Sequence, residues 1–126
     1  GFTMSTEKKR ILIVDDEEDT LEMLSTILEH ENYITWKATN GKEALELVKK
    51  LPDLILLDIR MPKVSGLEVC RRLKQDDKFK NIPIIIFSAK VLSHDIELGL
   101  NAGADEYITK PFKTKELTQL IKKHIS

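Results

Sequence analysis

The chain has 126 residues, enough for one hydrophobic core and too few for two. Its 20 basic and 21 acidic residues leave a net charge of −1, so no overall electrostatic field draws it to nucleic acid or to an anionic membrane. We expect one domain spanning 1–126, with 1–3 as a cloning remnant before Met4, and neither direct nucleic-acid binding nor membrane association. The single cysteine, Cys70, lies within a helical pattern and predicts a buried apolar residue in a reducing cytoplasm.

Predicted strands and helices alternate along the whole sequence. Short apolar runs predict strands at 11–14, 33–37, 54–57, 84–87 and 106–109. Each is followed by apolar residues at helical spacing: Leu21, Leu24, Ile27 and Leu28; Ala44, Leu45, Val48 and Leu51; Val69, Cys70 and Leu73; Ile96, Gly99 and Leu100; Leu117, Leu120 and Ile121. This alternation predicts an α/β fold in which helices cover both faces of a five-stranded parallel sheet.

Polar residues and glycine mark the expected ends of the helices. Asn40, with Glu43 three residues on, predicts a capped start for the second helix, and Ser93 is placed to cap the fourth. Gly103 is expected to end the fourth helix. His124, in the last predicted helix, is expected to be solvated and without a partner.

Acidic residues directly follow two of the strongest predicted strands. They are Asp15, Asp16, Glu17 and Glu18 after the first strand, and Asp58 after the third. Taken alone, the first run can also be explained as acids that favour a helix N-terminus. In an open parallel sheet, however, ligands bind outside the carboxyl ends of the strands, where the strand order reverses. With the order 2-1-3-4-5, Asp16 and Asp58 become neighbours in an oxygen-rich site suited to Mg²⁺.

Ser88 and Lys110 close the fourth and fifth predicted strands. A hydroxyl donor and a mobile cation at this edge of the sheet can hold a dianionic phosphoryl group. Taken alone, Ser88 is more typical of a turn, and Lys110-Pro111 of an extended dipeptide that ends a strand. Beside the acidic residues, the two side chains predict phosphoryl transfer.

One ordered set of motifs runs through 10–125. It comprises Asp15-Asp16, Asp58, Met61-Pro62, Gly66, Ser88-Ala89, 102–107 and Lys110-Pro111-Phe112. Each motif is weak by itself, but the ordered set is specific, and it resembles the receiver domain of two-component response regulators, of the chemotaxis-regulator type. The resemblance implies a flavodoxin-like sheet of order 2-1-3-4-5 and a phosphorylation switch in a cytoplasmic signalling pathway.

The resemblance also implies roles for individual acidic residues. Asp58 corresponds to the phospho-acceptor, which takes a phosphoryl group from a histidine kinase or a histidine phosphotransfer protein and becomes an aspartyl phosphate. Asp16 corresponds to a direct Mg²⁺ ligand and Asp15 to an acid that acts mostly through water. The backbone carbonyl of Arg60 corresponds to a third protein ligand, and Mn²⁺ is an alternative metal.

Further residues correspond to the switch. Ser88 matches the hydroxyl that turns toward the phosphoryl oxygens, and Lys110 the cation that pairs with them. Tyr107 matches an aromatic ring that moves between exposed and inward rotamers. In this family the Lys110-Pro111 bond is cis. Phosphorylation alters the face formed by helix four, strand five and helix five, where a downstream protein, an output domain outside this chain or a second copy of the chain would bind.

Two cations occupy positions at which the family tunes phosphoryl lifetime. Arg60 lies two residues after Asp58, and Lys90 lies two residues after Ser88. Our hypothesis is that these long side chains cover the phosphoryl group and slow its self-hydrolysis; the opposite effect would follow if a cation stabilised the transition state. Many receivers carry threonine at the position of Ser88. Serine keeps the hydroxyl of threonine but lacks its methyl group.

The residues together predict a receiver switch that catalyses its own phosphorylation and dephosphorylation at Asp58 without turning over an external substrate. The alternative is a receiver-like interaction module that is no longer phosphorylated. A hydrolase of the aspartyl-phosphate phosphatase type is a third class. It would need a second acid two residues after the nucleophile, where this sequence has Arg60.

Overall fold

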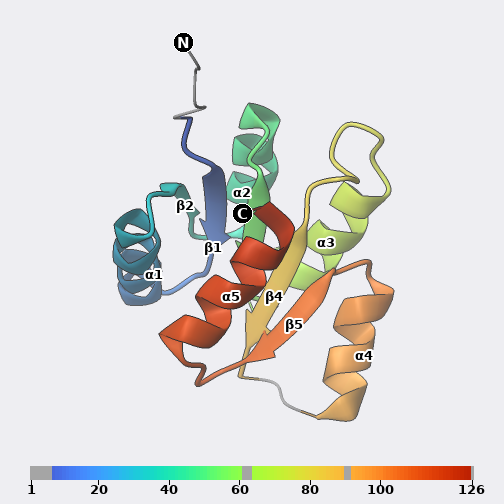
Figure 1. Cartoon of the computed structure of the whole chain (residues 1–126). Helices are drawn as coiled ribbons and strands as arrows, with labels where there is room; N and C mark the ends of the chain where they lie inside the picture. The colour runs from blue at the N-terminus through green and yellow to red at the C-terminus, as the bar shows by residue number, and fades with distance from the viewer. Residues whose placement is uncertain (1–6, 61–63, 90–91, 126) are drawn as a thin grey trace.

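A computed structural model describes residues 7–60, 64–89 and 92–125 of the chain. The expected remnant at 1–3, the motif residues Met61 and Pro62, and Lys90 lie outside the described residues. Parallel strands form one central sheet in the order β2-β1-β3-β4-β5, which confirms the predicted topology (Figure 1). Their bounds are β1 Arg10–Val14, β2 Ile34–Ala38, β3 Leu54–Leu57, β4 Ile84–Ser88 and β5 Glu106–Thr109.

Helices cover both faces of the sheet (Figure 1). Their bounds are α1 Glu18–His30, α2 Gly41–Leu47, the 3₁₀ helix η1 Val48–Lys50, α3 Gly66–Lys74, α4 Ser93–Asn101 and α5 Thr114–Ile125. The residues of α1 and α5 share one hydrophobic core, and those of α2 and α3 share the core on the opposite face. None of the described helices is long and apolar enough to cross a membrane.

Alternate residues of each central strand pack into these two cores. In β1, Ile11 and Ile13 belong to the core under α1 and α5, whereas Leu12 and Val14 belong to the core under α2 and α3. This two-sided burial explains why the central strands are apolar at successive positions. Cys70 is fully buried, and burial raises the pKa of its thiol to about 11, so it acts as a small packing residue.

The predicted helix ends are correct in two cases and wrong in one. Asn40 Oδ1 accepts a hydrogen bond from the Glu43 amide at 2.8 Å, which caps α2 as expected. Gly103, two residues after α4, has a φ of +107°, a conformation that glycine adopts without a Cβ penalty. Ser93 does not cap α4: it is already the first helical residue, and the N-cap is Leu92, which makes no side-chain cap hydrogen bond.

Two leucines expected on the buried faces of helices are exposed instead. The chain tightens into η1 after α2, and Leu51 follows in the left-handed region with a φ of 58° and 52% exposure. A 3₁₀ turn has about three residues rather than 3.6, so the apolar face expected from α-helical spacing rotates away from the sheet. Leu100 is 45% exposed because Gly99, beside it, is the residue of α4 that faces inward.

A cluster of polar side chains links the end of α5 to β5. His124 Nε2 and Lys123 Nζ each lie 2.9 Å from Glu106 Oε2. The expectation that His124 is solvated and without a partner is therefore wrong. The contact joins residues 18 positions apart, so it depends on the docking of α5 beside the sheet edge rather than on local sequence.

Candidate functional site

The carboxyl ends of β1 and β3 lie side by side and carry the first acids of the site. Val14 and Leu57 are register partners at the ends of β1 and β3. Asp15 and Asp58 directly follow them, so the two acids leave the sheet at the same level. The Asp58 amide donates to the Val14 carbonyl at 3.0 Å, which extends the ladder to the acid itself. The position of Asp58 is therefore fixed by backbone pairing and not by a loop.

Lys110 reaches into the site from the end of β5. Its Nζ lies 3.3 Å from Asp15 Oδ2 and 3.4 Å from Asp58 Oδ2, so one ammonium group bridges two carboxylates. The Lys110 amide donates to the Ser88 carbonyl at 2.8 Å, and its Nζ also lies 4.8 Å from the centre of the Phe87 ring. The peptide bond between Lys110 and Pro111 is cis.

Backbone amides hold the remaining oxygens of the two acids. The Arg60 amide donates to Asp58 Oδ1 at 3.0 Å, and the Glu17 amide donates to Asp15 Oδ1 at 2.8 Å. Each carboxylate therefore accepts one backbone bond and one bond from Lys110. These four contacts fix the orientation of both carboxylate planes.

Asp15 is completely buried, and its proton affinity reflects this. Burial is the main cause that raises its pKa from 3.8 to about 6, and the nearby charge of Asp58 raises it further. The Glu17 amide and the Lys110 ammonium act in the opposite direction, because they stabilise the charged form. The protein therefore holds a carboxylate under electrostatic stress next to Asp58, and an additional cation would relieve that stress.

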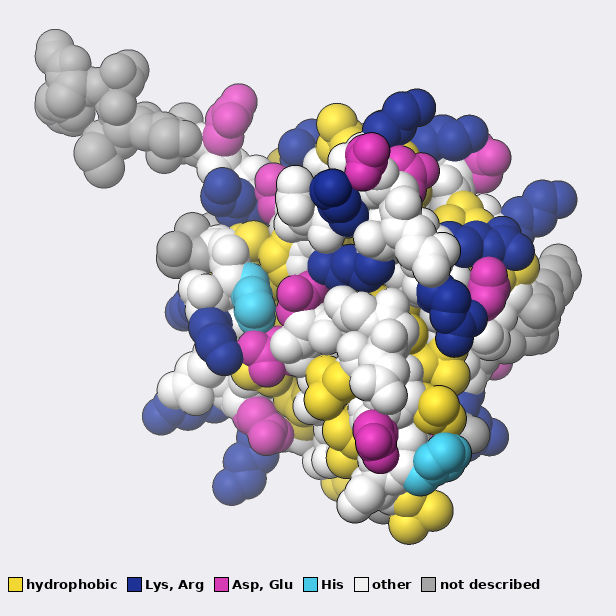
Figure 2. Space-filling view, turned by 90° about the vertical axis from the view of Figure 1, so that its right-hand side faces the viewer, with side chains coloured by type: hydrophobic (Ala, Val, Ile, Leu, Met, Phe, Trp, Pro, Cys, Tyr) yellow, Lys and Arg dark blue, Asp and Glu magenta, His cyan; other side chains and the backbone are white. Residues whose placement is uncertain are grey.

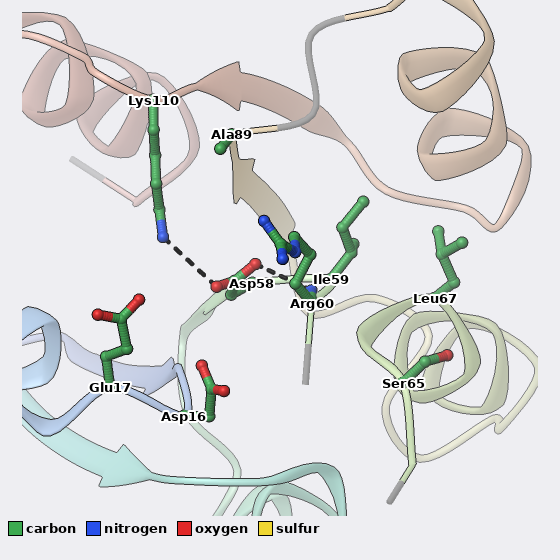
Figure 3. A pocket seen from close by; sticks show the side chains of 9 residues that line it. All are labelled: Asp16, Glu17, Asp58, Ile59, Arg60, Ser65, Leu67, Ala89 and Lys110. Carbon is green, nitrogen blue, oxygen red and sulfur yellow. Dashed lines mark hydrogen bonds and ion pairs between the residues drawn. The ribbon is translucent and has the colours of Figure 1, made fainter. Parts of the chain in front are cut away.

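A pocket of about 660 Å³ opens above these residues (Figure 3). The residues that line it are Asp16, Glu17, Asp58, Ile59, Arg60, Ser65, Leu67, Ala89 and Lys110. In Figure 3, Lys110 enters from one side of the pocket and Asp16 and Glu17 lie across from it, with Asp58 between Lys110 and Asp16. A ligand in this pocket would contact the acidic side chains that line it and the ammonium of Lys110.

The acidic donors fit a hard divalent cation. Carboxylate oxygens of Asp15, Asp16 and Glu17 lie within 4.8 Å of one another, and Asp58 faces the same pocket. The donors are all oxygen, which suits Mg²⁺ or Mn²⁺ better than zinc. Sequence reasoning gave Glu17 no role, although the uninterrupted acidic run 15–18 was a signal for it.

Ser88, the last residue of β4, lies close to Tyr107, the second residue of β5. Ser88 is completely buried, and its side chain lies near enough to the Tyr107 hydroxyl to offset part of the rise in pKa that burial causes there. The Tyr107 ring packs against the core under α2 and α3, and burial is the main cause that raises the pKa of its hydroxyl. The two residues assigned to the switch therefore contact each other, while Lys90, assigned to lifetime tuning, lies outside the described residues.

Comparison with known proteins gives consistent matches. The protein-family model of the response regulator receiver domain matches residues 11–122. The chain is 42% identical to the DNA-binding response regulator MtrA of Mycolicibacterium smegmatis over 120 residues, which is 94% of this chain and 51% of that protein. The chain thus spans about half the length of the curated relatives that it matches.

Solved structures share the same fold. The chemotaxis protein CheY4 of Vibrio cholerae superposes with a TM-score of 0.87 at 26% identity, over 94% of this chain and 99% of that one. The receiver domain of the sensor histidine kinase PA1611 from Pseudomonas aeruginosa also gives 0.87, at 28% identity over 94% and 98% of the two chains. That receiver has a magnesium ion coordinated in its active-site cleft.

Proposed function

Because this chain belongs to the response regulator receiver domains of two-component systems, we propose that Asp58 is the residue that accepts the phosphoryl group in its signalling switch. Lys110 carries the argument, since its ammonium lies within 3.4 Å of the Asp58 carboxylate and can pair with an incoming phosphoryl oxygen. The donor is a phosphorylated histidine kinase or histidine phosphotransfer protein. An Asp58 oxygen bonds to phosphorus as the bond between phosphorus and the donor histidine breaks.

The pocket supplies the ligands for a divalent cation beside Asp58. Asp16 is the proposed direct ligand, together with Asp58 and the Arg60 carbonyl, and Asp15 acts mostly through water. Mg²⁺ is the proposed ion, with Mn²⁺ as a substitute. When bound, such an ion offsets the charge of two anions that approach each other. Glu17 adds a further carboxylate at the pocket wall and so raises its attraction for cations.

Ser88 and Tyr107 connect the pocket to the surface in this proposal. Ser88 donates to a phosphoryl oxygen once Asp58 is modified, and Tyr107 follows because the two side chains lie next to each other. The affected face is that of α4, β5 and α5. Exposed apolar side chains on and beside α4 make this face suitable for a protein partner: Leu92, Leu98 and Leu100. Figure 2 shows hydrophobic side chains gathered in the lower half of this side of the molecule.

We assign the control of phosphoryl lifetime to Arg60 and Lys90. Arg60 lines the pocket next to Asp58, so its side chain can cover a phosphoryl group and exclude the attacking water. Slow self-hydrolysis is the expected consequence. Cutting both residues to alanine should then shorten the lifetime; a lifetime of seconds that the double variant leaves unchanged would contradict this role.

The biological setting follows from the same proposal. The receiver acts in the cytoplasm, where kinases supply the phosphoryl group, and it signals to a downstream protein or to an output domain. Relatives such as MtrA are named DNA-binding and are about twice as long, so this chain corresponds to their receiver half. The receiver itself is proposed to contact proteins rather than nucleic acid, with dimerisation on phosphorylation as one mode of output.

Phosphorylation by a small acyl phosphate tests the assignment directly. The protein is incubated with acetyl phosphate and Mg²⁺, and the added mass of a phosphoryl group is measured on the intact protein. We expect labelling of the unmodified chain, none with Asp58→Asn and none after chelation of the metal. Asp53→Asn is a matched control, because Asp53 lies at the other end of β3 and bonds Arg10. Labelling that persists in Asp58→Asn would place the acceptor elsewhere.

A further inference from the structure

Helix α4 lies against the edge strand β5 through a residue without a side chain (Figure 1). All residues of α4 are described, and Gly99 is the only one of them that is buried. Leu98 and Leu100, on either side of it in sequence, are 42% and 45% exposed. The helix therefore presents a glycine to the sheet at a position where an amphipathic helix ordinarily presents a large apolar residue.

The ring of Tyr107 occupies the space that a side chain at Gly99 would need. A Cβ at Gly99 would lie 2.9 Å from Tyr107 Cδ2, 3.0 Å from Tyr107 Cε2 and 3.0 Å from Ile86 Cδ1. Favourable carbon contacts lie at about 3.5–4.0 Å, so even a methyl group would require the ring or the helix to move. Ile86 is fully buried and pairs with Tyr107 across β4 and β5, so it leaves the ring little alternative space.

The hydroxyl of the same ring lies near Ser88, the residue proposed to contact the phosphoryl group. The Ser88 side chain is completely buried at the end of β4, and its proximity offsets part of the rise that burial causes in the pKa of the Tyr107 hydroxyl. A serine hydroxyl has one donor and two acceptor sites, so it can accept from Tyr107 while it donates to a phosphoryl oxygen. The seated ring is therefore compatible with Ser88 in the role proposed above.

We propose that Gly99 is a positioning residue for the switch: because it has no side chain, Tyr107 can lie inward with its hydroxyl beside Ser88. A larger residue at Gly99 pushes the ring toward solvent or lifts α4 from β5. In either case the Ser88 contact is weakened and the phosphorylated state loses stability relative to the unphosphorylated one. The packing of Tyr107 against Gly99 is independent of phosphorylation, whereas its link to the switch rests on the proposed function.

A double-mutant cycle tests the packing relationship without any phosphoryl group. Urea denaturation midpoints are compared for the unmodified chain, Gly99→Ala, Tyr107→Ala and the double variant. We expect Gly99→Ala to lower the midpoint of the unmodified chain. In the Tyr107→Ala background it should leave the midpoint unchanged or raise it, because alanine is the better helix former once the ring is gone. A Gly99→Ala protein that folds only as the double variant would give the same answer.

Asn101→Ala is the matched control for helix propensity, since Asn101 is exposed on the same helix. It should leave the midpoint unchanged or raise it in both backgrounds. Equal losses from Gly99→Ala with and without the Tyr107 ring would overturn the proposal, because the methyl group would then be meeting something else. No loss in the unmodified chain would overturn it as well.

Binding of beryllofluoride, a phosphoryl mimic, tests the link to the switch. Beryllofluoride is titrated in the presence of Mg²⁺ and followed by changes in amide NMR signals. We expect Gly99→Ala to weaken binding about threefold or more, as a shift in a two-state population predicts, and Asn101→Ala to leave it unchanged. Unaltered binding by a folded Gly99→Ala would overturn the link to the switch. Absence of binding by the unmodified chain would instead refute the proposed function and leave the packing result standing.

Discussion

The ammonium of Lys110 lies 3.3 Å from a carboxylate oxygen of Asp15, a side chain with no exposed surface. This pair places a buried acid and a mobile cation directly beneath the pocket that holds Asp58. One ammonium group serves two carboxylates there, and the pKa of Asp15 remains raised to about 6 in spite of it. The pocket therefore carries more negative than positive charge. We expect this imbalance to lower the folding stability of the metal-free protein and to favour the binding of a cation.

Asp15→Asn should stabilise the metal-free protein at pH 7. The folded-state pKa of Asp15 lies above its unfolded value of 3.8, so folding stability falls as the pH rises from about 4 to 6 and stays reduced above that range. A neutral amide does not carry this penalty, and we expect a gain of roughly 1–3 kcal/mol in the free energy of unfolding. The measurement is urea denaturation in the presence of a chelator.

Two comparisons control this prediction. As the pH falls below the unfolded pKa of 3.8, Asp15 becomes protonated in both states, and the advantage of Asp15→Asn should shrink toward zero. Mg²⁺ should raise the denaturation midpoint of the unmodified chain more than that of the variant, because ligands stabilise only the state that binds them. A variant that is less stable than the unmodified chain at pH 7 without metal would contradict the electrostatic interpretation.

Lys110→Met should impair binding of the phosphoryl mimic more than it impairs folding. The change roughly keeps the length of the side chain but removes the charge that bridges Asp15 and Asp58 and that lies over the Phe87 ring. We expect the beryllofluoride affinity to fall roughly tenfold or more, which corresponds to about 1.4 kcal/mol. Isothermal titration in excess Mg²⁺ measures it.

Lys113→Met provides the comparison for this charge removal. Lys113 is exposed three residues further on, so its loss changes the net charge equally without touching the pocket. Binding should then match that of the unmodified chain. Equal losses in the two variants would show that only the overall field matters, and Lys110 would lose its assigned role.

Gly66→Ala should damage the site through the backbone. A Cβ at Gly66 would lie 2.3 Å from the Asp58 carbonyl oxygen and 2.5 Å from Ile59 Cα, and neither of these backbone atoms can rotate away. The start of α3 or the end of β3 has to move, which should cost roughly 1–3 kcal/mol of stability and displace Asp58. Both urea denaturation and acetyl phosphate labelling should show the change.

Ser65→Ala separates local helix stability from the position of Asp58. Ser65 caps α3 by accepting from the Glu68 amide at 3.3 Å, so its loss should cost about 0.5–2 kcal/mol. Ser65 also lines the pocket, but its hydroxyl is bonded to the start of α3, so labelling of Asp58 should still proceed at the rate of the unmodified chain. If Ser65→Ala slows labelling as much as Gly66→Ala does, the effect of Gly66 comes from α3 stability alone.

The sequence predicts the sheet and its acidic edge because both depend on short-range patterns. Apolar runs that end in Asp15 and Asp58 define the strands, and parallel pairing then brings the two acids together. The burial of Leu51 is predicted from α-helical spacing, but the chain forms the 3₁₀ helix η1 just before it. A change of helix type leaves no clear mark on the amino-acid composition. Gly99 was expected on the buried face, but its contact with Tyr107 depends on the docking of α4 against β5.

The pairing of His124 with Glu106 is the other contact that local sequence could not show, and it leads to a prediction about acid stability. Hydrogen bonds from Lys123 and His124 lower the pKa of Glu106. A depressed carboxyl pKa stabilises the fold above the unfolded pKa, and this contribution is lost as the pH falls through the folded pKa. Glu106→Gln should therefore lower the free energy of unfolding by roughly 0.5–1.5 kcal/mol at pH 7.

At pH 3 the difference between Glu106→Gln and the unmodified chain should narrow, since both then carry a neutral side chain in the unfolded state and the native carboxylate is being protonated. Urea denaturation at the two pH values measures this. Glu97→Gln, an exposed acid on α4, is the control and should have little effect at either pH. If Glu106→Gln is neutral at pH 7, the cluster is only a surface contact, and the end of α5 is held to β5 by its apolar residues, among which Ile121 is fully buried.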